Sequence, residues 1–265
     1  MSRLPRRAFI LASAVALVMT LPVTVSANHS WGGYHWARTS NPFTLKLGDN
    51  VSSVWDPFLA TTSTDWSNST VLKTSIVPGG SRSVKLCDAT TGQVQVCNSR
   101  YGSNGWLGVA SIWASGSHIT KATVKLNDTY FSTASYNKPE WRNLVSCQEV
   151  GHTLGLDHQD VIFDNPNLGT CMDYTSDPLG PPDNQHPNQH DYNELVTIYT
   201  HLDSTTTVAS TPAIAPAAGA RAAGAPAADA AWGRLVQVTN HGHGAWYMQD
   251  LGAGNVILTH VFWAD

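Results

Sequence analysis

The sequence predicts an α+β fold, and three of its features support this prediction. Short runs in which apolar and polar residues alternate, such as residues 43–47 and 122–127, are typical of half-buried β-strands. A longer segment that begins at Pro139 repeats its apolar residues at helical spacing. Apolar residues make up 42% of the chain and charged residues only 13%, so there is ample apolar surface to bury. This composition excludes disorder driven by charge.

The N-terminus predicts export. Three arginines within the first seven residues precede an uncharged, mostly apolar run over 8–19, and residues 25–27 have the small-x-small form that signal peptidase accepts. Residues 1–27 are therefore expected to be the signal peptide of a secreted protein. The Arg6-Arg7 pair also fits a twin-arginine signal, so the export route stays open between the Sec and Tat pathways.

The charge balance excludes two classes of partner. The formal net charge is −4, and removal of residues 1–27, which contain three arginines and no acid, leaves −7. A chain with a net negative charge lacks the basic surface through which proteins bind nucleic acids and anionic membranes. No run of about 18 apolar residues follows the signal peptide, so no transmembrane helix is expected.

The segment 28–203 is expected to form the main domain. Residues 106–113 form a continuous apolar run that suits a buried strand, and residues 51–66 have helix-like spacing interrupted by Asp56-Pro57. A proline suits the first turn of a helix, so the clearest helix is expected from Pro139 until Gly155 stops it. Its single face carries Trp141, Leu144, Val145 and Gln148. A second helix is expected over 191–201, with Asp191 as its N-cap.

Two further segments follow this domain. Residues 204–231 are rich in alanine and interrupted by proline and glycine, which predicts an extended linker. Residues 232–265 contain three strand-like runs separated by glycine-rich turns, which predicts a small β-rich C-terminal segment. Three short strands are marginally stable alone, so this segment is expected to dock on another part of the chain.

All four cysteines lie in the exported part of the chain, where an even number favours two disulfides. Cys87 and Cys97 flank a turn-rich stretch between short β-like runs, so a local bridge between them is expected. That pairing leaves Cys147 with Cys171. Free thiols or a different pairing remain the alternative at this point.

The most informative segment is 148–158, Gln-Glu-Val-Gly-His-Thr-Leu-Gly-Leu-Asp-His. Positions four apart share a helix face, so Gln148 and His152 point to one place, with Glu149 beside them. Gly155 lets the chain leave the helix and turn back, so that His158 can reach the same place. Two imidazoles, a third donor and a nearby carboxylate are the components of a catalytic zinc site.

This segment resembles the extended zinc signature of the metzincin metallopeptidases, His-Glu-x-x-His-x-x-Gly-x-x-His, with Gln148 at the place of the first histidine. Residues 171–174, Cys-Met-Asp-Tyr, resemble the Met-turn of that clan. The chain is most similar to the matrixin-like branch of secreted bacterial enzymes, in element order over about 28–203. The resemblance implies a twisted sheet, an active-site helix, the Met-turn and a C-terminal helix.

The resemblance also implies roles for individual residues. His152 and His158 would bind Zn²⁺, and Glu149 would act as general base and acid. Met172 would form the hydrophobic floor below the metal, and Tyr174 would be an extra ligand or stabilise the developing oxyanion. A bridge between the cysteines that directly precede the zinc helix and Met172 would tie the helix to this floor.

Gln148 leaves three interpretations open, because an amide oxygen is a poorer zinc donor than an imidazole nitrogen. In the first, Gln148 ligates zinc weakly and the enzyme works. In the second, another histidine completes the site, and His186 and His190 follow the Met-turn in a loop that could reach it. In the third, metal binding is lost and the domain is a pseudo-protease that binds without cutting.

The function predicted from the sequence is that of a secreted, monomeric, zinc-dependent metalloendopeptidase acting on polypeptides. The alternative is a non-catalytic secreted binding protein, since Gln148 replaces a ligand histidine. The remaining histidines show no ligand spacing, so they are expected to be ordinary surface or core residues or, for the last two, parts of a turn: His29, His35, His118, His201, His260, His241 and His243.

Overall fold

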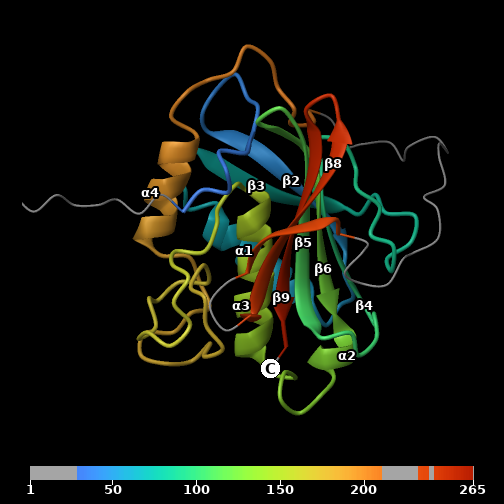
Figure 1. Cartoon of the computed structure of the whole chain (residues 1–265), viewed down its shortest axis with the longest axis vertical. Coiled ribbons are helices and arrows are strands. Elements are labelled where there is room, and N and C mark those ends of the chain that lie inside the picture. Colours follow the sequence, from blue (N-terminus) through green and yellow to red (C-terminus); the bar gives the residue numbers. More distant parts are fainter. Residues whose placement is uncertain (1–28, 211–231, 239–241, 265) are drawn as a thin grey trace, which may run out of the picture.

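The computed structural model describes residues 29–210, 232–238 and 242–264 of the chain. The predicted signal peptide and residues 211–231 of the predicted linker lie outside these ranges. The described part is a mixed α+β structure, as the sequence predicts, with one twisted sheet and helices packed against it (Figure 1). None of its helices combines the length and the apolar character needed to cross a membrane.

The sheet has nine strands in the described residues, and eight of them follow the order β3-β2-β4-β6-β5-β9-β8-β7. The ninth strand, β1, pairs with β6. Strands β3, β2, β4 and β6 run parallel, whereas β5, β9, β8 and β7 are joined by antiparallel pairings. Their bounds are β1 (His35–Trp36), β2 (Phe43–Asn50), β3 (Leu72–Pro78), β4 (Gln93–Ser99), β5 (Trp106–Ser115), β6 (His118–Asn127), β7 (Arg234–Val238), β8 (Gly244–Gly252) and β9 (Asn255–Trp263).

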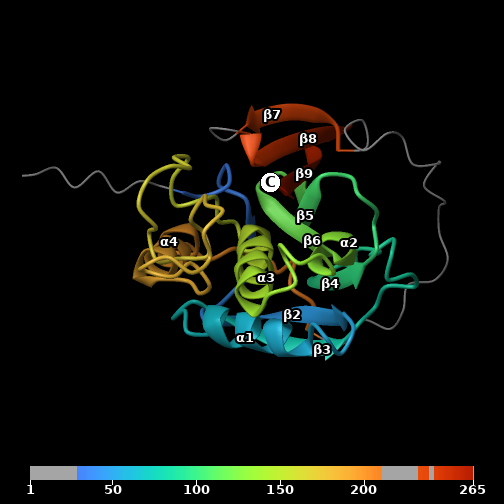
Figure 2. The same cartoon turned by 90° about the horizontal axis from the view of Figure 1, so that it is seen from below.

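Two of the helices pack against each other on one side of the sheet (Figure 2). Helix α1 (Asp56–Trp66) begins at the Asp-Pro step that interrupts the pattern in the sequence, because proline fits the first turn of a helix. Helix α3 (Pro139–Thr153) is the helix that the sequence predicts most clearly. The Thr62 and Ser146 hydroxyls lie 2.9 Å apart across the α1–α3 contact. A short helix, α2 (Asp128–Phe131), follows β6.

Helix α4 (Gln189–Ile198) begins two residues before the predicted start. The Asn188 side chain accepts the backbone N–H groups of His190 and Asp191, so Asn188 is the N-cap. Asp191 occupies the third helical position, and its side chain accepts the Asn188 N–H at 2.8 Å. The two residues thus form a reciprocal capping box, and the prediction of Asp191 as the N-cap is wrong for this reason.

The C-terminal segment is part of the main sheet. Strand β9 pairs with β5 along its whole length, and β8 and β7 follow it (Figure 1). Trp246, Leu258 and Phe262 belong to the same hydrophobic core as the strands and helices of the predicted main domain. The separation of residues 232–265 from that domain therefore needs correction: β5 has an open edge until β9 covers it, and the core is incomplete without their side chains.

The start of the predicted linker is also bound to the body of the protein. The Thr207 N–H donates to the Ala37 carbonyl at 2.9 Å, and the Ala209 N–H donates to the Gly92 carbonyl at 2.9 Å. These bonds show that the ordered domain continues beyond residue 203.

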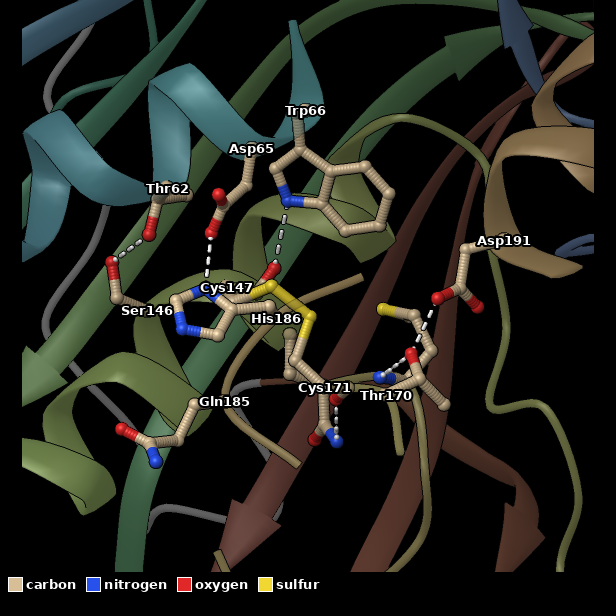
Figure 3. The surroundings of a disulfide bond; sticks show 12 residues. Thr62, Asp65, Trp66, Ser146, Cys147, Thr170, Cys171, Gln185, His186 and Asp191 are labelled. Atoms are coloured by element: carbon tan, nitrogen blue, oxygen red, sulfur yellow. Dashed lines mark hydrogen bonds and ion pairs between the residues drawn. A yellow bond between two sulfur atoms is a disulfide. The ribbon is translucent and has the colours of Figure 1, made fainter. Parts of the chain in front are cut away.

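Both expected disulfides are present. Cys87 pairs with Cys97, ten residues away, and Cys147 pairs with Cys171, 24 residues away. The second bridge links α3 to the segment that contains Met172, beside the indole N–H of Trp66, which donates to the Cys147 carbonyl at 3.1 Å (Figure 3). The cross-link therefore holds the 170–174 segment against the helix.

If β9 completes the core, truncating one of its inward leucines will destabilise the whole fold. Leu258 is 6% exposed, whereas Leu235 on β7 is 45% exposed. Leu258→Ala is expected to lower the free energy of unfolding by about 2–5 kcal/mol. The control Leu235→Ala should change it by less than about 0.5 kcal/mol. Denaturant unfolding of the full chain measures both, and equal small effects would contradict the integration of β9.

Candidate metal centre

Helix α3 and the turn after it position two of the predicted ligands. Gln148, Glu149 and His152 all lie on the buried side of α3. The helix ends at Thr153, and Gly155 then adopts a φ of +98°, where a Cβ would collide with the Tyr34 carbonyl oxygen. Only glycine fits this turn, which brings His158 back toward His152. Their ring centroids lie 4.9 Å apart.

The third histidine at this point is His260, which comes from β9. The strand register places it opposite Ala110 of β5 and Trp246 of β8, facing α3. Its ring centroid lies 4.1 Å from that of His152 and 4.9 Å from that of His158. Each of the three imidazoles has a nitrogen within 4.8 Å of the others, a spacing at which one metal ion could contact all three. These residues are called the three-histidine centre below.

The hydrogen bonds of these rings leave at least one nitrogen of each ring available to bind a metal ion. The Nδ1–H of His152 donates to the Leu156 carbonyl at 2.9 Å, and His260 Nδ1 lies 3.2 and 3.3 Å from the two Glu149 oxygens. The buried Nε2 atoms of His152 and His260, and both ring nitrogens of His158, have no hydrogen-bond partner in the described structure. Metal-binding histidines commonly use this arrangement, with the second nitrogen held by a carbonyl or a carboxylate.

Burial determines the charge of the centre. It lowers the pKa of His152 and of His260 to about 3, and it lowers the pKa of His158 well below its ordinary value. The imidazoles are therefore neutral near pH 7, which is the form that binds metal. Burial raises the pKa of Glu149 to about 8, although His152 and the Ala110 backbone N–H both oppose this shift. The site thus disfavours protons on its imidazoles and, without a bound cation, favours the neutral form of the Glu149 carboxyl group beside them.

The Gln148 side chain makes two hydrogen bonds to the backbone of the 171–173 segment. Its side-chain amide donates to the Cys171 carbonyl at 2.7 Å and to the Asp173 carbonyl at 2.9 Å. Its oxygen Oε1 is buried and has no hydrogen-bond partner in the described structure. Gln148 therefore holds the 171–173 segment against α3, while its Oε1 atom forms no hydrogen bond of its own.

The two other histidines considered from the sequence lie elsewhere. His186 Nδ1 is 2.7 Å from the Asp65 carboxylate, near the Cys147–Cys171 bridge (Figure 3). His190 stacks on His29 with ring centroids 4.7 Å apart. The second interpretation of Gln148 expected His186 or His190 to join His152 and His158. In the structure the histidine beside them is His260 instead.

Met172 and Tyr174 both lie next to the centre. Met172 is fully buried, and its sulfur lies so near Gly151 that a Cβ there would be 2.5 Å from it. It therefore lies directly beneath the turn of α3 that carries His152. The Tyr174 ring is 5.4 Å from the His158 ring, but its hydroxyl accepts the backbone N–H groups of His243 and Gly244. In this structure that hydroxyl anchors the start of β8.

The three-histidine centre is sealed from solvent. His152 and His260 are fully buried, and His158 is 4% exposed. The Trp246 ring covers them, with its centroid 4.8 Å from His152 and 4.6 Å from His260, and Trp31 packs on Trp246 at 3.8 Å. A substrate could reach the centre only after this cover moved.

His260 is the residue that the sequence analysis missed. Alternate residues of its strand, Val256, Leu258, His260 and Phe262, share one face, and the other three are apolar. A histidine on an otherwise apolar strand face indicates either a buried hydrogen bond or a ligand. That pattern could have identified His260, but nothing in it indicates that β9 lies against α3.

Comparisons with known proteins add one structural likeness. No protein-family model and no curated protein matches the chain. Among solved structures, it is similar to high choriolytic enzyme 1, a hatching-enzyme zinc protease from the medaka fish Oryzias latipes. The TM-score is 0.35 at 10% sequence identity, and the match covers 63% of this chain and 94% of that one. At these values the likeness establishes neither family nor function.

If His260 is a ligand, its removal will cost the protein one metal ion. His260→Ala should lower the zinc content by about one equivalent, because two imidazoles and an amide hold zinc far less tightly than three imidazoles do. His186→Ala removes a histidine outside the centre and should leave the zinc content unchanged. Elemental analysis of dialysed, folded protein measures both variants. Equal zinc content in wild type and His260→Ala would exclude His260 from the metal site.

Proposed function

We propose that this chain is a secreted, zinc-dependent metalloendopeptidase that acts as a monomer on polypeptides. The observation that carries this proposal is the convergence of three neutral, buried imidazoles, each with a nitrogen free of hydrogen bonds, beside the carboxyl group of Glu149. His152, His158 and His260 would hold the ion. Zinc held by three histidines supplies the Lewis acidity that peptide hydrolysis needs.

Glu149 would hold and move the proton. Its two oxygens are nearly equidistant from His260 Nδ1, so one N–H bond fixes the carboxylate and leaves acceptor capacity on both oxygens. The same bond orients His260 and raises the basicity of its free nitrogen. Glu149 would therefore have two roles, positioning a ligand and accepting a proton from the attacking water.

Access to the centre is the condition for activity. Trp246 and Trp31 close the space above the histidines, so the described conformation is a closed form. A polypeptide would reach the imidazoles when the Trp246 side chain and the start of β8 move aside. The export proposal is independent of this step, and two disulfides are typical of proteins in an oxidising compartment.

A second candidate function is a non-catalytic secreted binding protein with a structural zinc ion. Complete burial of the centre favours it, because structural zinc sites are closed and catalytic sites keep an open position. The free Gln148 oxygen could also complete a four-donor set. The two functions differ in what Glu149 does, so this residue provides the test.

Glu149→Gln keeps the side-chain shape and an acceptor for the His260 N–H but removes the base. At matched zinc occupancy, cleavage of an unfolded protein substrate should fall by about 100- to 10,000-fold, the usual contribution of a general base. The control Glu140→Gln makes the same change in the first turn of the same helix and should retain full activity. If Glu149→Gln cuts as fast as wild type, the peptidase proposal is wrong. If zinc-loaded wild type does not cut at all, the binding protein is the better assignment.

A further inference from the structure

A second group of polar side chains, three buried and His190 half-buried, lies where residues 29–31 meet α4. It consists of His29, His190, Asp191 and Glu194, and is called the His29 site below. Donor atoms of His29, His190 and Asp191 all lie within 4.8 Å of one another. His29 is 4% exposed, Asp191 is fully buried and Glu194 is 4% exposed, so water does not solvate their polar ends.

The His29 site contains five buried polar atoms that have no hydrogen-bond partner in the described structure. They are both ring nitrogens of His29, Nδ1 of His190, Oδ1 of Asp191 and Oε1 of Glu194. Buried polar atoms are almost always bonded, because desolvating one without compensation costs about 1–3 kcal/mol. Five such atoms on four neighbouring side chains indicate that a ligand belongs among them.

The local structure fixes these atoms in place. One oxygen of Asp191 accepts the Thr170 hydroxyl (Figure 3) and the Asn188 N–H. The other, Oδ1, accepts no hydrogen bond in the described structure and lies opposite His29 Nε2 at ion-pair distance, 3.4 Å. His190 and Glu194 are four residues apart and share a face of α4.

Charge also points to a cation. Neither Asp191 nor Glu194 forms an ion pair with a lysine or arginine among the described residues. A comparable cluster elsewhere is balanced: Asp203 binds Arg38 at 2.8 Å, and His118 lies 3.1 Å from its other oxygen. The His29 site has the carboxylates without the arginine, so a divalent cation would supply the missing positive charge.

We propose that His29, His190 and Asp191 bind a divalent transition-metal ion of the zinc type, with the carboxylate of Glu194, one helical turn after His190, as a further nearby negative charge. Two imidazoles and a carboxylate form a donor set that suits Zn²⁺, and the burial of His29 and Asp191 indicates a structural site. It clamps residues 29–31 to α4. This segment is tied to the turn after α3, because the Asp157 N–H donates to the His29 carbonyl and the Trp31 N–H to the Gly155 carbonyl.

The test is zinc content of the full exported chain after dialysis. Wild type should hold two equivalents, while His190→Ala and His260→Ala should each hold one and the double variant none. His118→Ala, in the balanced cluster, should still hold two. Added zinc should raise the melting temperature of His260→Ala, in which only the His29 site remains, and leave that of the double variant unchanged.

Glu194→Gln provides a second, shape-preserving variant and should weaken the zinc that remains in His260→Ala. The proposal is overturned if His190→Ala holds as much zinc as wild type, or if zinc does not stabilise His260→Ala. Because the His260→Ala series reports on the three-histidine centre separately, failure of the His29 site is distinguishable from failure of the proposed peptidase.

Discussion

The antiparallel pairing of β9 with β5 is the constraint on which the site depends. This register puts His260 opposite Ala110, and Ala110 in turn places its backbone N–H against Glu149. One strand contact therefore supplies the third imidazole and supports the carboxylate that orients it. The next pairing, of β9 with β8, puts Trp246 beside His260 and closes the centre. The C-terminal strands thus contribute both to the main core and to the three-histidine centre, so the two cannot be assigned to separate modules.

Burial explains why the three-histidine centre disfavours protons on its imidazoles. In a fully buried site the imidazolium form is strongly disfavoured, so the histidines keep their lone pairs far below neutral pH. The same burial favours the neutral form of Glu149, whose pKa rises to about 8. A divalent cation reverses this balance for the carboxylate, because nearby positive charge stabilises its ionised form. Binding of the ion would therefore prepare Glu149 as a base at neutral pH.

Local pattern was enough to predict most of the fold and part of the site. Helix α3, the strands over 106–113 and 122–127, both disulfides and the proximity of His152 to His158 follow from periodicity, the Gly155 turn and cysteine spacing. The position of β9 could not be predicted, because it depends on which sheet edge a strand joins across a separation of 140 to 157 residues. Gln148 illustrates the same limit. The sequence indicated its amide as a candidate weak ligand, but its bonds to the Cys171 and Asp173 carbonyls are contacts between distant segments and could not be predicted.

The turn between His152 and His158 connects the three-histidine centre to the proposed His29 site. The Leu156 carbonyl in this turn accepts the His152 Nδ1–H and so fixes the orientation of that ring. Residues 29–31 pair with residues 155–157 of this turn through backbone hydrogen bonds. The direction of His158 therefore depends on the 29–31 segment, which contributes His29 to the proposed second site. A cation at that site would order the turn that aims His158, and the second site would thus stabilise the first without contacting it.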